Sequence, residues 1–98
     1  MLHGRVEIGC DPAKRARTLA ERGLDFFDAV FVFAGRAVTL EDIRRDYGES
    51  RFQTYGLLRG RWVQVVWTPR GDIHHVISMR HCHEREIRRL EEHLGRPG

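Results

Sequence analysis

Two arginines with titratable neighbours are the residues of this chain best suited to chemistry. Arg51 begins a strand-like run, and Arg80 ends another one. The titratable side chains beside them are Tyr47, Glu49, His81 and His83. A guanidinium group is a planar fork of donors that fits phosphate oxygens, and an ordinary histidine titrates at about pH 6.5. Arginines at the rim of a small sheet can therefore bind and polarise a phosphate.

Three strand-like runs carry these residues. They span residues 51–58, 62–68 and 73–80, and each is rich in branched and aromatic side chains. Arg59-Gly60 is a typical two-residue hairpin turn, and residues 69–72 read Pro-Arg-Gly-Asp, which favours a second turn. The sequence predicts a three-stranded antiparallel meander.

Alternation along these strands predicts which side chains share a face. On the last strand, Ile77 and Met79 are expected on the core face, with His74 and Val76 on the opposite face. A single bulge would reverse such an assignment. If the polar faces of neighbouring strands coincide, the residues lining the open surface are Arg51, Tyr55, Ser78 and Arg80.

A helix is predicted before the meander. Asp11 is expected to cap its first amide groups, Pro12 suits its first turn, and Gly23 ends it. The aromatic stretch at residues 24–33 is expected to begin as one helical turn at Asp25 and then become extended.

A second helix is predicted at the end of the chain, where Ile87, Leu90 and Leu94 share one helical face. Short strands are expected around residues 6–8 and 38–40. The predicted class is α+β. It consists of a small antiparallel sheet, formed by the meander and short N-terminal strands, packed with an N-terminal and a C-terminal helix.

Length and composition limit the classes of protein. Ninety-eight residues suffice for one domain, predicted at 1–94 with a flexible tail at 95–98. A net charge of +3 permits nucleic-acid binding without requiring it. Cys10 and Cys82 lack the CxxC spacing, which favours a reduced cytoplasmic protein over a disulfide scaffold. No run approaches the roughly 20 apolar residues of a membrane helix.

The order of these segments resembles the BrnT family, the toxin halves of a bacterial type II toxin–antitoxin pair. The similarity covers about residues 8–90. The chain departs from the usual family residues at Cys10, where a tryptophan is common, and at His81, where a lysine is common. The segments that carry the similarity are Asp11–Lys14, Asp25–Phe26, Asp42–Phe52, Gly56–Leu58, Ile77–Arg80 and Glu84.

This resemblance implies a RelE-like fold and an endoribonuclease that needs neither a metal nor a cofactor and inhibits translation and growth. It also implies a BrnA-like antitoxin with a ribbon-helix-helix domain, which neutralises the toxin and represses the shared operon. Operator DNA would be contacted only through the antitoxin. A homodimer and a heterotetramer with the antitoxin are both compatible with such a system.

In metal-independent RNA cleavage, protein side chains must perform three catalytic functions. The 2′-hydroxyl loses a proton, the pentavalent phosphate is stabilised and the 5′-oxygen gains a proton. We predict Arg51 and Arg80 as the phosphate ligands, with His83 and Glu49 as catalytic partners. The alternative for the two arginines is an exposed or ion-paired structural role, and for His81 and His83 it is a capping or solvated position at the start of the helix. The residues predicted to bind RNA are Arg45, Tyr47, Tyr55 and His81.

Two other hypotheses arise from the same residues. A metal site among His74, His75 and the residues 81–83 is disfavoured, because adjacent strand residues point to opposite faces and zinc needs about four converging ligands. The alternative function is a non-catalytic co-repressor that acts through a DNA-binding partner. In either case, part of the apolar stretch at residues 26–33 is a candidate surface for the antitoxin or for a second copy.

Overall fold

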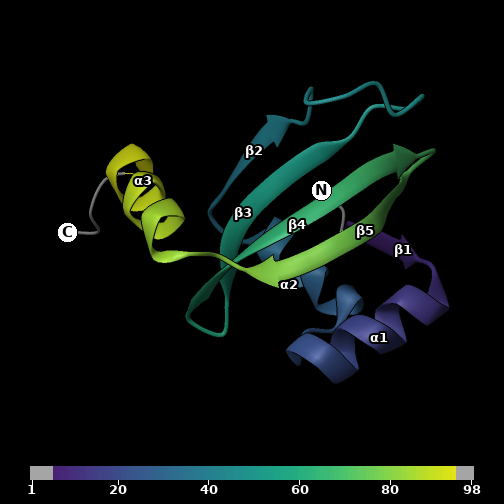
Figure 1. Ribbon diagram of the computed structural model, residues 1–98, viewed down its shortest axis with the longest axis horizontal. Coiled ribbons are helices and arrows are strands. Elements are labelled where there is room, and N and C mark those ends of the chain that lie inside the picture. The colour runs from purple at the N-terminus through teal and green to yellow at the C-terminus, as the bar shows by residue number, and fades with distance from the viewer. Residues whose placement is uncertain (1–5, 95–98) are drawn as a thin grey trace, which may run out of the picture.

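The computed structural model describes residues 6–94, which form five strands, three α-helices and one short 3₁₀ helix (Figure 1). The class is α+β, with the N- and C-terminal helices that the sequence predicts. The predicted tail at 95–98 lies outside the described residues. In chain order the elements are β1 (Glu7–Cys10), α1 (Pro12–Arg22), the 3₁₀ helix η1 (Phe26–Asp28), α2 (Ala29–Ala34), β2 (Ala37–Glu41), β3 (Phe52–Leu58), β4 (Arg61–Arg70), β5 (Ile73–His81) and α3 (Glu84–Leu94).

The five strands form one sheet in the order β1-β5-β4-β3-β2. Strands β3, β4 and β5 are the predicted antiparallel meander, and β2 extends it by pairing with β3. Strand β1 pairs with β5 in parallel, which makes the sheet mixed. The residues of β1 do not indicate whether it pairs parallel or antiparallel. The path of the chain through α1 sets this direction.

The two turns of the meander differ in how well the sequence predicts them. Arg59 and Gly60 both have positive φ angles, 50° and 80°, as a tight hairpin turn requires. The second turn is shorter than predicted, because Pro69 and Arg70 still pair with β5 and only residues 71–72 form the turn.

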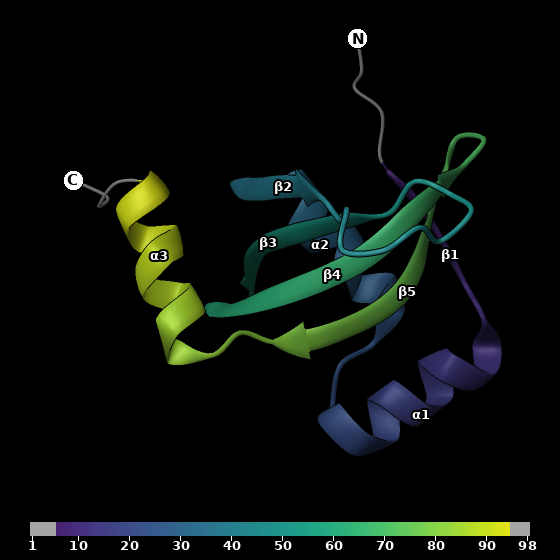
Figure 2. The same ribbon diagram turned by 45° about the horizontal axis from the view of Figure 1, so that its top comes forward.

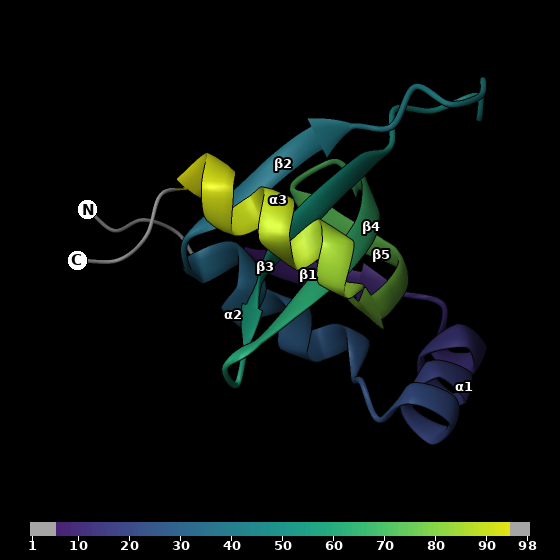
Figure 3. The same cartoon turned by 60° about the vertical axis from the view of Figure 1, so that its left-hand side comes forward.

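Helices α1 and α2 lie on the same side of the sheet, whereas α3 stands apart at one end of it (Figures 2 and 3). The core between the sheet and the first helices contains Leu24, Phe26, Ala29, Val32, Leu58, Val63, Val65, Val76 and Met79. No helix within residues 6–94 has the length and apolarity to cross a membrane.

The extended chain predicted after Asp25 is wrong, because residues 29–34 form helix α2. Their branched and aromatic side chains suit a strand, yet tertiary packing overrides this local preference. Ala29 and Val32 are fully buried against the sheet. Gly56 of β3 permits this contact, since a Cβ added there would lie 2.8 Å from a methyl carbon of Val32.

Replacing Gly56 with alanine is expected to destabilise the fold by about 1–3 kcal/mol, because the added methyl group overpacks the contact with Val32. Urea unfolding followed by circular dichroism would measure the change. The matched control is Gly35→Ala, where a Cβ makes only an ordinary 3.6 Å contact. An equal loss of stability in both variants would contradict this account of the packing.

A bulge changes the predicted faces of β5. Strand β4 skips one residue of β5 between the Val66 and Trp67 pairs, and the skipped residue is Ile77. Val76 and Met79 are therefore both buried on the helix-covered face. The predictions that Ile77 shares the core face of Met79, and that Val76 lies opposite it, are wrong, because the extra residue shifts the alternation by one.

The same bulge brings His74 to the helix-covered face, where it stacks on Trp67 with ring centroids 4.1 Å apart. Phe33 of α2 packs edge-on against both rings. Among residues 6–94, the buried Nδ1 atom of His74 has no hydrogen-bond partner. Burial lowers the pKa of His74, because a charged imidazolium would lose its hydration there.

Because of the lowered pKa of His74, we expect the protein to lose stability in acid. In the unfolded chain the imidazole binds a proton at about pH 6.5, whereas in the folded protein it does so only at lower pH. The free energy of unfolding should therefore be at its full value above about pH 6.5 and fall as the pH drops below it. Urea unfolding across about pH 5–8 would measure this slope. His74→Phe keeps an aromatic ring and should reduce the slope, leaving the part that comes from His75 and His81, whose pKa values burial also lowers. An unchanged slope would contradict the assignment.

Candidate functional site

A row of polar side chains crosses the sheet face that α1 and α2 leave open. Gln64 of β4 pairs with Tyr55 of β3 on one side and with Arg80 of β5 on the other. The side-chain amide of Gln64 donates a hydrogen bond to the Tyr55 hydroxyl (3.0 Å), which in turn donates to the side-chain oxygen of Gln53 (3.0 Å). Alternation and register thus bring Tyr55 and Arg80 to the same surface, as predicted.

Arg80 is held in a fixed orientation by the first turn of α3. Its Nη1 and Nη2 atoms donate to the two carboxylate oxygens of Glu86 at 2.9 and 2.8 Å, and Nη1 also donates to the backbone oxygen of His81 at 3.1 Å. Within residues 6–94, no partner is found for the Nε–H group or for the second N–H of Nη2. This edge of the guanidinium can form two parallel bonds to a phosphate.

Glu86 is the residue that the sequence analysis missed. It also accepts a hydrogen bond from the backbone N–H of His83 at 2.8 Å, which fixes the junction between β5 and α3. The hydrogen bonds from Arg80 lower the pKa of Glu86 to about 2, so its carboxylate is charged at neutral pH. Six residues and a change of element separate the pair, and no helical or strand spacing signals such a contact.

Given the phosphate role predicted for Arg80 from the sequence, Glu86→Gln is expected to lower the rate of RNA cleavage by roughly tenfold to a hundredfold, because a neutral amide cannot accept both Arg80 bonds and the guanidinium loses its orientation. Glu92→Gln, on the exposed surface of α3, is the matched control. Single-turnover cleavage of a labelled RNA would separate this loss from a change in binding. A Glu86→Gln variant as fast as the control would show that the ion pair has no positioning role.

A second polar cluster lies in the loop that joins β2 to β3. The Arg51 guanidinium sits over the Tyr47 ring, 4.0 Å from its centroid, and Glu49 lies 3.5 Å from its Nε atom. Glu49 also faces Arg70 at 3.7 Å. With Arg45, these loop residues line a shallow hollow of about 580 Å³. Two residues predicted to bind RNA, Arg45 and Tyr47, and two predicted catalytic residues, Glu49 and Arg51, are thus gathered around a single loop.

Asp42 anchors this loop from beneath. It is nearly buried, and both carboxylate oxygens accept hydrogen bonds from the Arg44 side chain at 2.8 and 2.7 Å. The Tyr47 hydroxyl donates to the same carboxylate at 3.3 Å. The Arg44 guanidinium holds the pKa of Asp42 well below its usual range. A charged aspartate therefore fixes the ring on which Arg51 rests.

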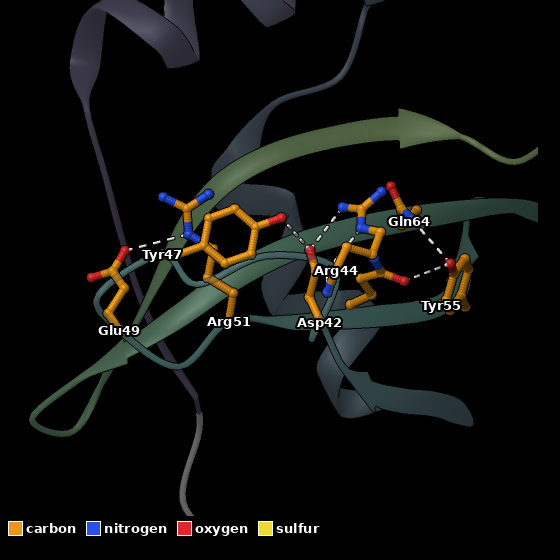
Figure 4. Close-up of polar contacts among 8 residues, drawn as sticks. Asp42, Arg44, Tyr47, Glu49, Arg51, Tyr55 and Gln64 are labelled. Atoms are coloured by element: carbon orange, nitrogen blue, oxygen red, sulfur yellow. Dashed lines mark hydrogen bonds and ion pairs between the residues drawn. The ribbon is translucent and has the colours of Figure 1, made fainter.

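The two clusters lie at different levels of β3, one before its first residue and the other beside Tyr55 at its middle. Arg80 pairs with Gln64 of β4. Phe52 pairs with Trp67, so the preceding residue Arg51 lies at the level of Thr68. Gln64 and Thr68 are four residues apart, which corresponds to roughly 14 Å along β4 at the usual rise of a strand. Because Glu86 holds the Arg80 guanidinium and the loop residues Tyr47 and Glu49 flank that of Arg51, the two side chains do not converge on one phosphate in this structure. Along β3 in Figure 4, the labelled side chains are Glu49, Arg51, Tyr47, Asp42, Arg44, Gln64 and Tyr55.

His81 and His83 separate from each other at the end of β5. His81 pairs with the buried Val63, so its ring belongs to the helix-covered face, opposite to that of Arg80. Burial lowers the pKa of His81, and its Nδ1 atom is buried without a partner among residues 6–94. His83 is exposed at the start of α3, close enough to help stabilise the charged form of Glu86.

The sequence model of one protein family matches residues 10–86, and the family is described as the ribonuclease toxin BrnT of type II toxin–antitoxin systems. The match covers most of the chain and includes both polar clusters. The chain belongs to the BrnT family. Among curated proteins, none matches the chain. The resemblance noted in the sequence is thereby confirmed.

Membership in the BrnT family identifies the chain as an RNA-cleaving toxin with an RNA substrate and a cognate antitoxin. The family match ends at Glu86, so the rest of α3 lies beyond it. Within residues 6–94, no three His, Cys, Asp or Glu side chains gather closely enough to hold a metal ion.

Proposed function

We propose that this BrnT toxin cleaves RNA with its own side chains, without a metal ion, at the end of the open sheet face where Arg80 lies. Cleavage in the cytoplasm would inhibit translation and growth, and a BrnA-like ribbon-helix-helix antitoxin would neutralise the toxin. The observation that carries the proposal is the Arg80 guanidinium, which Glu86 holds through Nη1 and Nη2 while its Nε–H and the second N–H of Nη2 have no partner within residues 6–94.

The reaction uses the groups around that edge. Two N–H groups of Arg80 bind the non-bridging oxygens of the scissile phosphate and stabilise the charge that develops on them. His83 and the Tyr55 hydroxyl are the proton-transfer groups on this side. Their proximity to Arg80 is supported by the hydrogen bond from the backbone N–H of His83 to Glu86, and by Gln64, which pairs with Tyr55 on one side and with Arg80 on the other.

The loop cluster takes a different role from the one first predicted. Because Arg51 and Glu49 are far from Arg80 along β3, we assign them to RNA binding together with Arg45 and Tyr47. An RNA strand following the open face would then contact Arg80 at the cleaved phosphate and Arg51 at a phosphate farther along. The face carried by His81 is turned away from this path, so His81 has no direct contact with RNA in this proposal.

Cleavage by the purified chain would test the proposal. A labelled single-stranded RNA is incubated with the wild-type chain in excess EDTA, beside Arg80→Ala. Cleavage by the wild type alone supports a metal-independent reaction at Arg80. Cleavage that disappears with EDTA and returns with magnesium would overturn the metal-independent mechanism.

Expression in a bacterium tests whether the chain inhibits growth and whether the antitoxin neutralises it. Induction of the wild-type chain alone should arrest growth with loss of RNA, and co-expression of a BrnA-like antitoxin should restore growth. A folded wild-type chain that neither cleaves RNA nor slows growth, yet still strengthens operator binding by its antitoxin, would instead identify a co-repressor.

A further inference from the structure

We propose that a hollow between β2 and α3 binds a nucleobase of the RNA, next to the phosphate held by Arg80. This inference rests on the proposed function, because it takes Arg80 as the phosphate ligand. The hollow has a volume of about 500 Å³, within the range of small-ligand sites. Its lining residues are Val38, Thr39, Leu40, Tyr55, Glu86, Arg89, Leu90 and His93.

The floor of the hollow is a continuous apolar and aromatic surface. Val38 of β2 pairs with Tyr55 of β3, and Leu40 lies two residues farther along the same edge strand. Leu90 of α3 is buried against this surface, whereas Leu40 remains 54% exposed. A planar base can cover such a surface with little regard to its identity, because every base has a face that stacks on aromatic and apolar side chains.

The rim of the hollow is polar and carries the positive charge of Arg89, while the Glu86 carboxylate is already paired with Arg80. Arg89 and His93 project from successive turns of α3, and both line the hollow. Arginine and histidine supply hydrogen-bond donors, which suit the acceptor atoms on base edges and the nearby RNA backbone. An apolar floor with a cationic rim fits a nucleotide better than an apolar peptide side chain.

Glu86 connects the hollow to the proposed cleavage site. It lines the hollow, and its two carboxylate oxygens bind Arg80. The proposed phosphate ligand is therefore bonded to a residue that lines the base site, and Tyr55, which also lines it, is separated from Arg80 on the sheet only by Gln64. One nucleotide can thus place its base in the hollow and its phosphate at Arg80. The hollow would select the base beside the cleaved bond.

Binding of mononucleotides to the full chain tests the inference. The four nucleoside 5′-monophosphates are titrated into isotope-labelled protein, with ribose 5-phosphate as a probe that lacks a base. We expect the nucleotides to shift the NMR signals of Leu40 and Leu90, while ribose 5-phosphate leaves these signals in place. Equal shifts from ribose 5-phosphate, or nucleotide-induced shifts confined to other parts of the chain, would overturn the proposal.

Two neighbouring arginines of α3 provide a matched pair of variants. Arg89 lines the hollow, and Arg88 is exposed outside it. Arg89→Ala should weaken nucleotide binding by about fivefold or more, the lower end for one arginine–base contact, and change the base preferred at the cleavage site. Arg88→Ala removes the same charge and should do neither. If the two variants weakened nucleotide binding and changed the base preference equally, the effect would be explained by net charge alone, and the proposed base site would be wrong.

The two proposals can fail separately. If the wild type cleaves RNA but nucleotides do not shift the NMR signals of Leu40 and Leu90, the base site is wrong and the ribonuclease mechanism stands. If nucleotides shift these signals but the chain does not cleave RNA, the base site stands and the mechanism is wrong.

Discussion

Replacing Arg80 with alanine is expected to lower the rate of RNA cleavage by about 100- to 1,000-fold, the usual cost of losing one preorganised donor to a developing oxyanion. The Arg80 guanidinium is held by Glu86, belongs to the same sheet face as Tyr55, and keeps two N–H groups without a partner within residues 6–94. Single-turnover cleavage at saturating protein would measure the chemical step. Circular dichroism would confirm that the variant folds.

Two further variants define what this result means. Arg17→Ala removes an equal charge from the exposed surface of α1 and should cleave at the wild-type rate. Arg51→Ala should mainly weaken RNA binding, because the loop cluster lies away from the cleaved phosphate. If Arg51→Ala abolished the chemical step and Arg80→Ala spared it, the catalytic centre would belong to the loop.

Replacing Phe26 with alanine is expected to destabilise the protein by about 3–5 kcal/mol, as is typical for removing a buried phenylalanine. Phe26 is fully buried in η1, against the core beneath the sheet. Domains of this size have a total stability of about 5–15 kcal/mol, so the variant should lose much of its folded population and its toxicity. Urea unfolding would measure the loss.

Phe27 provides the matched control, since it is the adjacent residue of the same type. Its ring is 44% exposed and contacts the Arg15 guanidinium 4.3 Å from its centroid. Phe27→Ala should cost about 1 kcal/mol or less, as expected for an exposed cation–π contact. Comparable losses at both positions would mean that η1 is anchored by its solvent-facing side, contrary to the burial of Phe26.

Local signals in the sequence were sufficient for most of the secondary structure. Asp11 accepts the capping hydrogen bond from Ala13 at 3.1 Å, and Gly23 ends the helix with a φ of 70°. These features depend on neighbours within a few residues, which is why the sequence reveals them. The hairpin at Arg59 and Gly60 is of the same kind.

The local pattern was insufficient where distant contacts compete with it. The stretch after Asp25 has the composition of a strand, but its packing against Gly56 makes it helical. The bulge at Ile77 depends on how β4 and β5 fit together, and one extra residue exchanges the faces of everything before it. Alternation therefore placed Arg80 correctly and His74 wrongly on the same strand.

The chemical groups of the candidate site could be identified from the sequence, because the residue type alone gives the functional group of arginine, histidine, glutamate and tyrosine. Their grouping was decided by the tertiary structure. Antiparallel register sets Arg51 and Arg80 far apart on one sheet, and the turn into α3 brings Glu86 onto Arg80. The sequence by itself determined the family, the class of fold and the candidate residues. Only the packing of strands and helices distant in the chain decided which of them act together, because such contacts leave no periodic signal.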